Sequence, residues 1–409
     1  MPELLAPAAD ESMITAASQG GADAVYFGVS SLNMRQGARN FHVDNLKQLV
    51  ERCHELDLLA YLTVNTIVYD SEIDQMNSIL DKAAEAKVDS LICWDPAVVT
   101  AAGERGLNIH LSTQASVSNT ASAKFWKEKG VSRVILAREL SLEQIAVIKR
   151  DSGVEVESFI HGALCVALSG RCMMSHYHTG RSGSRGECVQ PCRREYEVRD
   201  VETGDMYRVG NHYVMSPRDL STLPFIDKLM DCGIDCFKIE GRNRSPEYVK
   251  TVTKCYRIAM EAAVEDKLDQ ELIDRLKARL VRVYSRGFSD GFYFGLPAGD
   301  SWAGNTGSSA THKKVYVGLV KKFYKKVMAA EVLLQNRDLA VGEQIMAIGP
   351  TTGVINHTVK EIQIDHNSVE TAKKGSFIAL KTDEIWRRGD KLYILVPVVP
   401  LAEEVDQAE

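Results

Sequence analysis

The sequence predicts a two-domain α/β protein, in which a TIM-like (β/α)8 barrel at residues 1–295 precedes a small all-β barrel. The first observation is length, because 409 residues exceed one ordinary domain. The second is the regular alternation of β-rich runs with helical segments up to about residue 290, which indicates a parallel sheet. The third is that no G-x-G-x-x-G turn follows the first predicted strand, so a barrel fits better than a Rossmann sheet.

Short apolar runs mark the candidate strands of the first domain, and polar, helix-forming segments separate them. The candidate strands are residues 3–8, 24–28, 59–66, 90–95, 108–116, 133–139, 156–164, 213–220 and 236–241. The candidate helices are residues 45–56, 72–86, 122–130, 141–151, 245–265 and 269–285. This order predicts strands that are buried on both faces and connected by helical crossovers.

A glycine- and serine-rich stretch at residues 296–312 is typical of a linker between two domains. Beyond it, residues 313–400 contain short strands with turn residues between them and no helical periodicity, which predicts the small β-barrel. Residues 401–409 are expected to form a frayed tail.

Composition excludes several classes of protein. The net charge of −6 means that a nucleic acid would have to bind a locally basic face. The first residues lack a basic segment followed by an apolar run, and no apolar segment approaches twenty residues, so we expect a cytoplasmic protein without a membrane span. Nine cysteines in such a protein are more often metal ligands or catalytic thiols than disulfide partners.

Polar residues recur where the predicted strands end. They are Asn65, Thr66, Asp95, Ser112, Gln114, Arg138, Glu139, His161, Lys238 and Glu240. Any one of them is more often a turn or capping residue. Because the chemistry of a TIM-like barrel collects at the carboxyl ends of its strands, their recurrence predicts a shared pocket there.

The cysteines divide into two groups. Cys53, Cys93 and Cys255 lie in predicted helices or strands and are expected to be buried core residues. Four others follow the strand at residues 156–164 with the spacing C-x6-C-x15-C-x3-C; they are Cys165, Cys172, Cys188 and Cys192. This spacing differs from the paired C-x2-C knuckles of zinc ribbons, and four thiolates suit either iron–sulfur or zinc. Cys232 and Cys236 are expected to pack in the core at the opposite end of the barrel and are reserve candidates for a fourth ligand.

The segment ESFIHGALCVALSGRCMMS resembles the signature of the collagenase-like peptidase family U32. The signature positions that match are Glu157, Phe159, Gly162, Ala163, Leu164, Cys165, Gly170, Cys172, Met174 and Ser175. PELLAPA, HLSTQASVSN and KIEGRNRSPEYV resemble the same family, so the likeness covers about residues 1–300. FWKEKGVSRVILARELSLEQI and GECVQPCRREYEV are most similar to the branch that modifies tRNA uridine.

This resemblance implies an oxygen-independent hydroxylation enzyme. It implies a [4Fe–4S] cluster on Cys165, Cys172, Cys188 and Cys192, with tRNA as the partner and prephenate as co-substrate. The implied reaction is 5-hydroxylation of the wobble uridine of tRNA. An rRNA base or a ubiquinone precursor is the alternative acceptor for the same machinery.

A dicarboxylate such as prephenate requires arginines at the barrel mouth, because guanidinium groups bind carboxylates in a bidentate manner. The candidate substrate-binding residues are Arg138, Arg242, Asn65, Gln114 and Arg171. The candidate catalytic residues are His161, Lys238 and Glu240. Lys238 and Glu240 lie two residues apart on one strand, so they are either an internal ion pair or an acid–base pair in the pocket.

Two other functions compete. A peptidase would need a catalytic motif; H-E-x-x-H is absent, and Cys165 with His161 is the one tempting thiol–imidazole pair. A non-catalytic RNA-binding scaffold would use the tract KKFYKK, in which two aromatic residues lie among lysines, either as an RNA face or as a solubilising strand. The residues of that tract are Lys321, Lys322, Phe323, Tyr324, Lys325 and Lys326. Residues 313–391 contain fourteen Lys and Arg against nine Asp and Glu, which favours an RNA face.

Overall fold

Eight parallel strands close into a barrel in the computed structural model, which describes residues 1–37, 39–207, 215–297, 301–304 and 307–398. The ring runs in the order β1-β2-β3-β4-β5-β6-β7-β11, and β11 pairs with both β7 and β1. Its strands are β1 (Glu3–Pro7), β2 (Ala24–Gly28), β3 (Leu59–Val64), β4 (Ser90–Cys93), β5 (Ile109–Leu111), β6 (Arg133–Ile135), β7 (Glu155–Ala163) and β11 (Cys236–Ile239). The predicted TIM-like fold is therefore confirmed.

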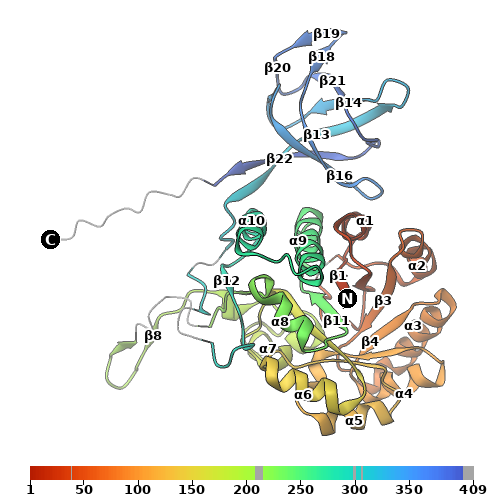
Figure 1. Cartoon of the computed structure of the whole chain (residues 1–409), viewed down its shortest axis with the longest axis vertical. Coiled ribbons are helices and arrows are strands. Elements are labelled where there is room, and N and C mark those ends of the chain that lie inside the picture. The colour runs from red at the N-terminus through yellow and green to blue at the C-terminus, as the bar shows by residue number, and fades with distance from the viewer. Residues whose placement is uncertain (38, 208–214, 298–300, 305–306, 399–409) are drawn as a thin grey trace.

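Helices cover the outside of this ring (Figure 1). They are α1 (Glu11–Gly20), α2 (Leu46–His54), α3 (Ile73–Ala86), α4 (Pro96–Glu104), α5 (Thr120–Glu128), α6 (Leu142–Ser152), α8 (Ile226–Asp231), α9 (Pro246–Val264) and α10 (Gln270–Leu280). Asp10 caps α1 by accepting from the backbone N–H of Met13, and Ser141 and Gln144 form a capping box at α6. No helix in the described ranges is long and apolar enough to cross a bilayer.

The crossover between β7 and β11 is much longer than the others. It holds the short helix α7 (Met174–Thr179), the hairpin of β8 (Val198–Arg199) and β9 (Met206–Tyr207), and β10 (Asp219–Ser221). Within the described residues, β10 is the only strand that forms near the strand predicted at residues 213–220. It pairs antiparallel with the end of β7 and parallel with β12 (Phe288–Ser289), outside the ring. The strand predicted at residues 213–220 is therefore not one of the eight barrel strands, because β11 and β6 already occupy the two edges of β7.

The C-terminal part is all-β, as predicted. An antiparallel sheet has the order β17-β16-β22-β13-β14-β21-β18-β19, and β15 and β20 form a small second sheet. The bounds are β13 (His312–Tyr324), β14 (Ala329–Leu334), β15 (Leu339–Ala340), β16 (Gln344–Gly349), β17 (Gly353–Thr358), β18 (Ile362–Ile364), β19 (Asn367–Val369), β20 (Thr371–Ala372), β21 (Phe377–Lys381) and β22 (Lys391–Pro397). The predicted tail at 401–409, and residues 298–300 and 305–306 of the predicted linker, lie outside the described residues.

The C-terminal β-rich part, residues 312–397, is called the β-domain below. It packs on the barrel through α1 and α9 (Figure 1). Thr15 donates to the carbonyl of Pro350 at 2.7 Å, and Gln19 donates to the carbonyl of Thr352 at 2.9 Å. Met346, Ile348 and Val354 of the β-domain also belong to the hydrophobic core of the barrel. A shared apolar core fixes the two domains against each other.

Candidate functional site

The four cysteines of the predicted cluster line one cavity. Cys165 follows the end of β7 by two residues, and Cys172 precedes α7. Cys188 lies in the loop after α7, and Cys192 lies in the short 3-10 turn Pro191–Arg193. The cavity has a volume of about 330 Å³ and opens at the carboxyl ends of the barrel strands.

Glycine and serine residues let these loops fold back on each other. A side chain at Gly183 would lie 3.2 Å from the carbonyl oxygen of Cys172 and 3.8 Å from the sulfur of Cys188. Gly186 has a φ of +85° and would place a Cβ 2.1 Å from the carbonyl oxygen of Asn33, so only glycine fits there. The hydroxyl of Ser175 accepts from the backbone N–H of Val189 at 3.1 Å, which ties α7 to the Cys188 loop.

Backbone groups donate to two of the thiols. The N–H of Met174 lies 3.4 Å from the Cys172 sulfur, and the N–H of Gln190 lies 3.4 Å from the Cys188 sulfur. Hydrogen bonds to cysteine sulfurs are among the contacts that tune metal and iron–sulfur sites. Arg193 donates to the carbonyl of Leu164, so the turn that contains Cys192 lies beside the segment that contains Cys165.

The electrostatic surroundings of the thiols are mixed. Cys165 and Cys188 are exposed, and Cys172 and Cys192 are half-buried. Burial raises the pKa of Cys192, whereas the adjacent Arg193 lowers it, and the three other thiols are near enough to raise this pKa further. Within the described part of the chain, no three His, Cys, Asp or Glu side chains come close enough together to hold one metal ion.

A second, smaller cavity of about 60 Å³ lies inside the barrel, next to the cysteines. Six of the predicted site residues line it, and they are Asn65, Gln114, Arg138, Lys238, Glu240 and Arg242. Gln114 and Arg138 line both cavities, and so does Arg35. The strand ends therefore bring six of the ten predicted polar residues together beside the thiols, whereas Thr66, Asp95, Glu139 and His161 line neither cavity.

Glu240 is an ionised carboxylate held by cations. Its Oε1 lies 2.8 Å from Nη2 of Arg35, and the hydroxyl of Tyr26 lies 3.3 Å from Oε2. Burial acts to raise the pKa of Glu240, but Arg35, Arg138 and Arg242 outweigh it and hold this pKa at about 2. A carboxyl group with so low a pKa orients cations and does not donate protons near neutral pH.

Lys238 forms the floor of the inner cavity and pairs with Glu157, whose Oε1 lies 2.7 Å from its Nζ. The ammonium also lies 4.4 Å from the centre of the Tyr26 ring, within cation–π range. Lys238 and Glu240 thus have separate partners and do not form an ion pair with each other.

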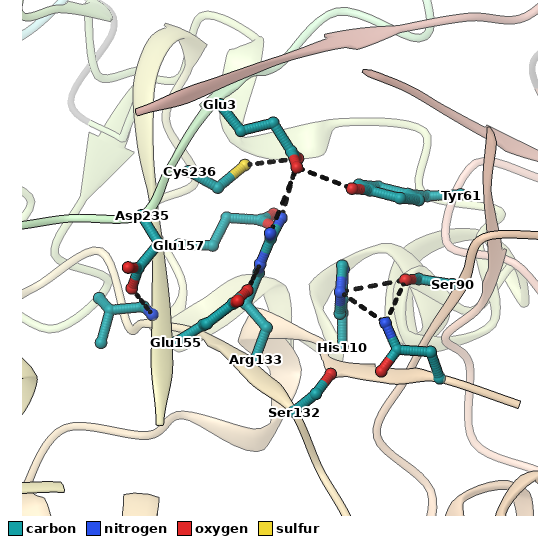
Figure 2. A network of polar contacts seen from close by, with 12 residues as sticks. Glu3, Tyr61, Ser90, His110, Ser132, Arg133, Glu155, Glu157, Asp235 and Cys236 are labelled. Carbon is teal, nitrogen blue, oxygen red and sulfur yellow. Dashed lines mark hydrogen bonds and ion pairs between the residues drawn. The ribbon is translucent and has the colours of Figure 1, made fainter. Parts of the chain in front are cut away.

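A charged network lies where several barrel strands begin, at the amino-terminal end of the barrel (Figure 2). Arg133 bonds to Glu3 and to Glu155 at 2.8 Å each, and it lies 3.6 Å from Glu157. Cys236 donates to Glu3 at 3.3 Å. Because this network lies at the end opposite to the cysteines, its role is to hold the strands together.

The remaining predicted binding residues that line the inner cavity have polar partners. Arg242 donates to Thr63 at 3.1 Å, and burial lowers its pKa to about 10. Arg138 donates to the carbonyl of Ala163 at 2.7 Å and stacks 3.8 Å from the Phe159 ring centre. The Asn65 amide lies 3.3 Å from the Ser112 hydroxyl, which donates to Gln114.

Two of the candidate catalytic and substrate-binding residues lie outside both cavities. His161 bonds to the hydroxyl of Tyr256 at 3.2 Å and packs against Tyr248 and Phe288. Burial lowers the pKa of His161 to about 3, so the ring is neutral near pH 7. Arg171 is exposed and bonds to Ser116 at 3.1 Å.

Arg35 and Arg193 are the site residues that the sequence did not reveal. Arg35 lies seven residues after β2 ends. Site residues were expected directly at the strand ends, so a residue this far into the loop was not predicted. Arg193 stands next to a predicted ligand, and its contact with Leu164 bridges residues 29 positions apart. That contact depends on the tertiary fold of the cysteine loops.

The reserve cysteines and the lysine tract lie elsewhere. Cys236 joins the network at the opposite barrel end, and the Cys232 sulfur faces the carbonyl of Lys228 at 3.2 Å. In the tract at residues 321–326, Phe323 packs against the β-domain core, and Tyr324 bonds to Glu331 at 2.8 Å. The four lysines of the tract are exposed.

Comparisons with known proteins place this site in a family context. Residues 10–302 match peptidase family U32. A protein of Porphyromonas gingivalis named collagenase is 42% identical over 96% of this chain and 97% of its own length. The tRNA hydroxylation protein P1 of Bacillus subtilis is 33% identical over 91% of this chain and 89% of its own length. The 23S rRNA 5-hydroxycytidine C2501 synthase of Escherichia coli is 36% identical over 65% of this chain and 40% of its own length.

Proposed function

Since the chain belongs to peptidase family U32, we propose that it is a tRNA modification enzyme that hydroxylates C5 of the wobble uridine. Relatives named for tRNA and rRNA hydroxylation support RNA as the substrate class. The observation that carries the proposal is the cavity at the barrel mouth, where four thiols share a wall with Gln114 and Arg138. A peptidase site has no need of four cysteines around one cavity.

The cofactor of this proposal is a [4Fe–4S] cluster on Cys165, Cys172, Cys188 and Cys192. The donor set fits it, because four thiolates are its usual ligands and two of these sulfurs accept backbone hydrogen bonds. All four thiols line one cavity of about 330 Å³, as ligands of one shared group would. When bound, such a cluster supplies a redox or Lewis-acid centre at the barrel mouth.

A small dicarboxylate such as prephenate is the proposed co-substrate. Arg35 and Arg138 line both cavities, and Arg242 lines the inner one, so guanidinium groups converge on the space beside the thiols. Guanidinium pairs bind carboxylates through two parallel hydrogen bonds. In this proposal Glu240 fixes Arg35, and Arg138 is fixed by its stack on Phe159.

A cysteine peptidase is disfavoured by the position of His161. That ring bonds to Tyr256 and lies outside the cavity of Cys165, so it does not pair with the thiol. A neutral imidazole with a pKa of about 3 is also a poor base for activating a thiol.

Mass spectrometry of tRNA nucleosides from a strain that lacks the gene tests the proposed function. We expect 5-hydroxyuridine and the nucleosides made from it to disappear from tRNA, with rRNA nucleosides unchanged. Loss of an rRNA hydroxycytidine instead would move the activity to rRNA, and unchanged nucleosides in both would reject an RNA hydroxylase.

A further inference from the structure

A large groove runs between the barrel mouth and the β-domain. Its volume is about 750 Å³, and the loops after β1, β2 and β11 form one wall, while β13, β16 and β22 form the other. Five cationic side chains line it, and they are Arg39, Arg242, Arg244, Lys314 and Lys391. Asp10 is the one acidic side chain among the described residues of its lining. The groove therefore concentrates positive charge on a chain whose net charge is −6.

The domain contact holds the walls of this groove in place. Lys314 on β13 pairs with Glu247 on α9 at 2.8 Å, and both domains share one apolar core next to it. The groove therefore lies beside a fixed contact between the two domains.

Three of the five cations of the groove remain able to bind an anion, because Lys314 is paired with Glu247 and Arg242 is buried and donates to Thr63. The Arg39 side chain is 83% exposed and meets Asp10 at 3.3 Å, and such an exposed pair is weak. Lys391 is exposed at the start of β22. Arg244 lies 3.5 Å from the Tyr284 ring centre, a contact that leaves the edge of its guanidinium group free for hydrogen bonds.

Two further features suit a nucleic acid. Tyr393 lines the groove, and the Lys314 ammonium lies 4.7 Å from its ring centre, so an aromatic ring and a cation stand together in the wall. Helix α9 begins at the groove with Ser245 as its N-cap, and the Ser245 side chain makes no capping bond, so the positive end of this helix adds to the cationic wall.

The groove joins the reaction site. Gly37 and Asn243 line both the groove and the cysteine cavity, and Arg242 lines both the groove and the inner cavity. A strand bound along the groove would thus pass directly beside the thiols. The lysine tract at residues 321–326 lines neither the groove nor either cavity.

We propose that this interdomain groove, and not the lysine tract, binds the phosphate backbone of the substrate RNA and positions a single unpaired base at the cysteine cavity. This assignment rests on the proposed function, since it names how that function holds its RNA. Lysine and arginine contacts to phosphates release counterions, so binding by the groove must weaken with salt.

Two matched double variants of the full chain test the groove. Arg39→Gln with Lys391→Gln removes two charges from the groove, and Lys325→Gln with Lys326→Gln removes two charges from the tract. Binding of a tRNA transcript with uridine at the wobble position is measured by fluorescence anisotropy at several salt concentrations. Circular dichroism checks that both variants are folded as the wild type is.

We expect the groove variant to bind tRNA about tenfold more weakly at low salt, with the slope of log K against log salt reduced by about 1.5. The tract variant should bind like the wild type. Equal weakening by both variants, or weakening by the tract variant alone, would overturn the groove assignment while the wild type still hydroxylates tRNA. A wild type that neither binds nor hydroxylates tRNA would reject the proposed function and the groove together.

Discussion

Glu157 and Lys238 form an ion pair of 2.7 Å inside the barrel, and their side chains are 0% and 5% exposed. The pair joins β7 to β11, the two strands that close the ring. Removing one member of a buried pair leaves a charge without its partner in a medium of low polarity. The pair therefore links the two strands that close the barrel, and it holds in place a lysine that lines the inner cavity.

Glu157→Gln tests this coupling. We expect it to lower the free energy of unfolding by about 3 kcal/mol, because it leaves Lys238 buried without an ionised partner. Glu155→Gln is the matched control, since Glu155 also pairs with Arg133 but its side chain is 51% exposed, and it should cost less than about 1 kcal/mol. Urea denaturation measures the free energy of unfolding of both variants, and an equal loss of this free energy in the two would contradict the expectation.

Gly162→Ala should destabilise the end of β7. Gly162 has a φ of +102°, and a Cβ there would lie 2.4 Å from the carbonyl oxygen of Glu240. Gly103 is a matched control, because it lies in helix α4, and a Cβ there would meet no atom within 4 Å beyond its own helix. We expect Gly103→Ala to raise the thermal midpoint slightly and Gly162→Ala to lower it by several degrees. A neutral Gly162→Ala would show that this close approach is not present in the protein.

Iron and sulfide analysis tests the proposed ligand set. Anaerobically purified wild type should contain about four irons and about four sulfides per chain. Cys188→Ala should lose most of both, because it removes a thiol from the cavity. Cys232→Ala should keep them, since its sulfur faces a backbone carbonyl outside that cavity. One zinc and no sulfide in the wild type would contradict the cluster.

The pH dependence of stability should reveal the cations around Glu240. The pKa of Glu240 is lowered from its ordinary value of 4.5 to about 2, so the folded state favours the ionised carboxylate. Its contribution to stability is complete above about pH 4.5 and is lost as the pH falls through about 2. The stability difference between wild type and Glu240→Gln, measured in cluster-free protein, should therefore shrink over this range. A difference that does not change with pH would argue against the Arg35 contact.

The sequence was sufficient to predict the barrel and the position of the four cysteines along one cavity at its mouth. Both follow from local rules: alternating strands and helices predict the ring, and loops after one strand end must lie at its mouth. Cys165 to Cys192 are also close in sequence, so a short looped segment can bring them together. For the same reason, the polar strand-end residues line one cavity, among them Gln114, Arg138 and Glu240.

Partner choice inside the barrel did not follow from the sequence. Lys238 and Glu240 lie in one predicted strand, yet Lys238 pairs with Glu157, which is 81 residues away, and Glu240 pairs with Arg35, which is 205 residues away. Those pairs depend on which strands close the ring and in what register. His161 shows the same limit, because a register shift between β11 and β7 occurs at this residue.

Restoration of 5-hydroxyuridine in the gene-deletion strain tests the central claim most directly. A plasmid that carries the wild type or Cys255→Ala should restore the nucleoside, because Cys255 is buried in α9 away from the cysteine cavity. A plasmid that carries Cys172→Ala should not restore it, although the protein accumulates to the same level. Full restoration by Cys172→Ala would contradict a reaction that depends on the four-cysteine site.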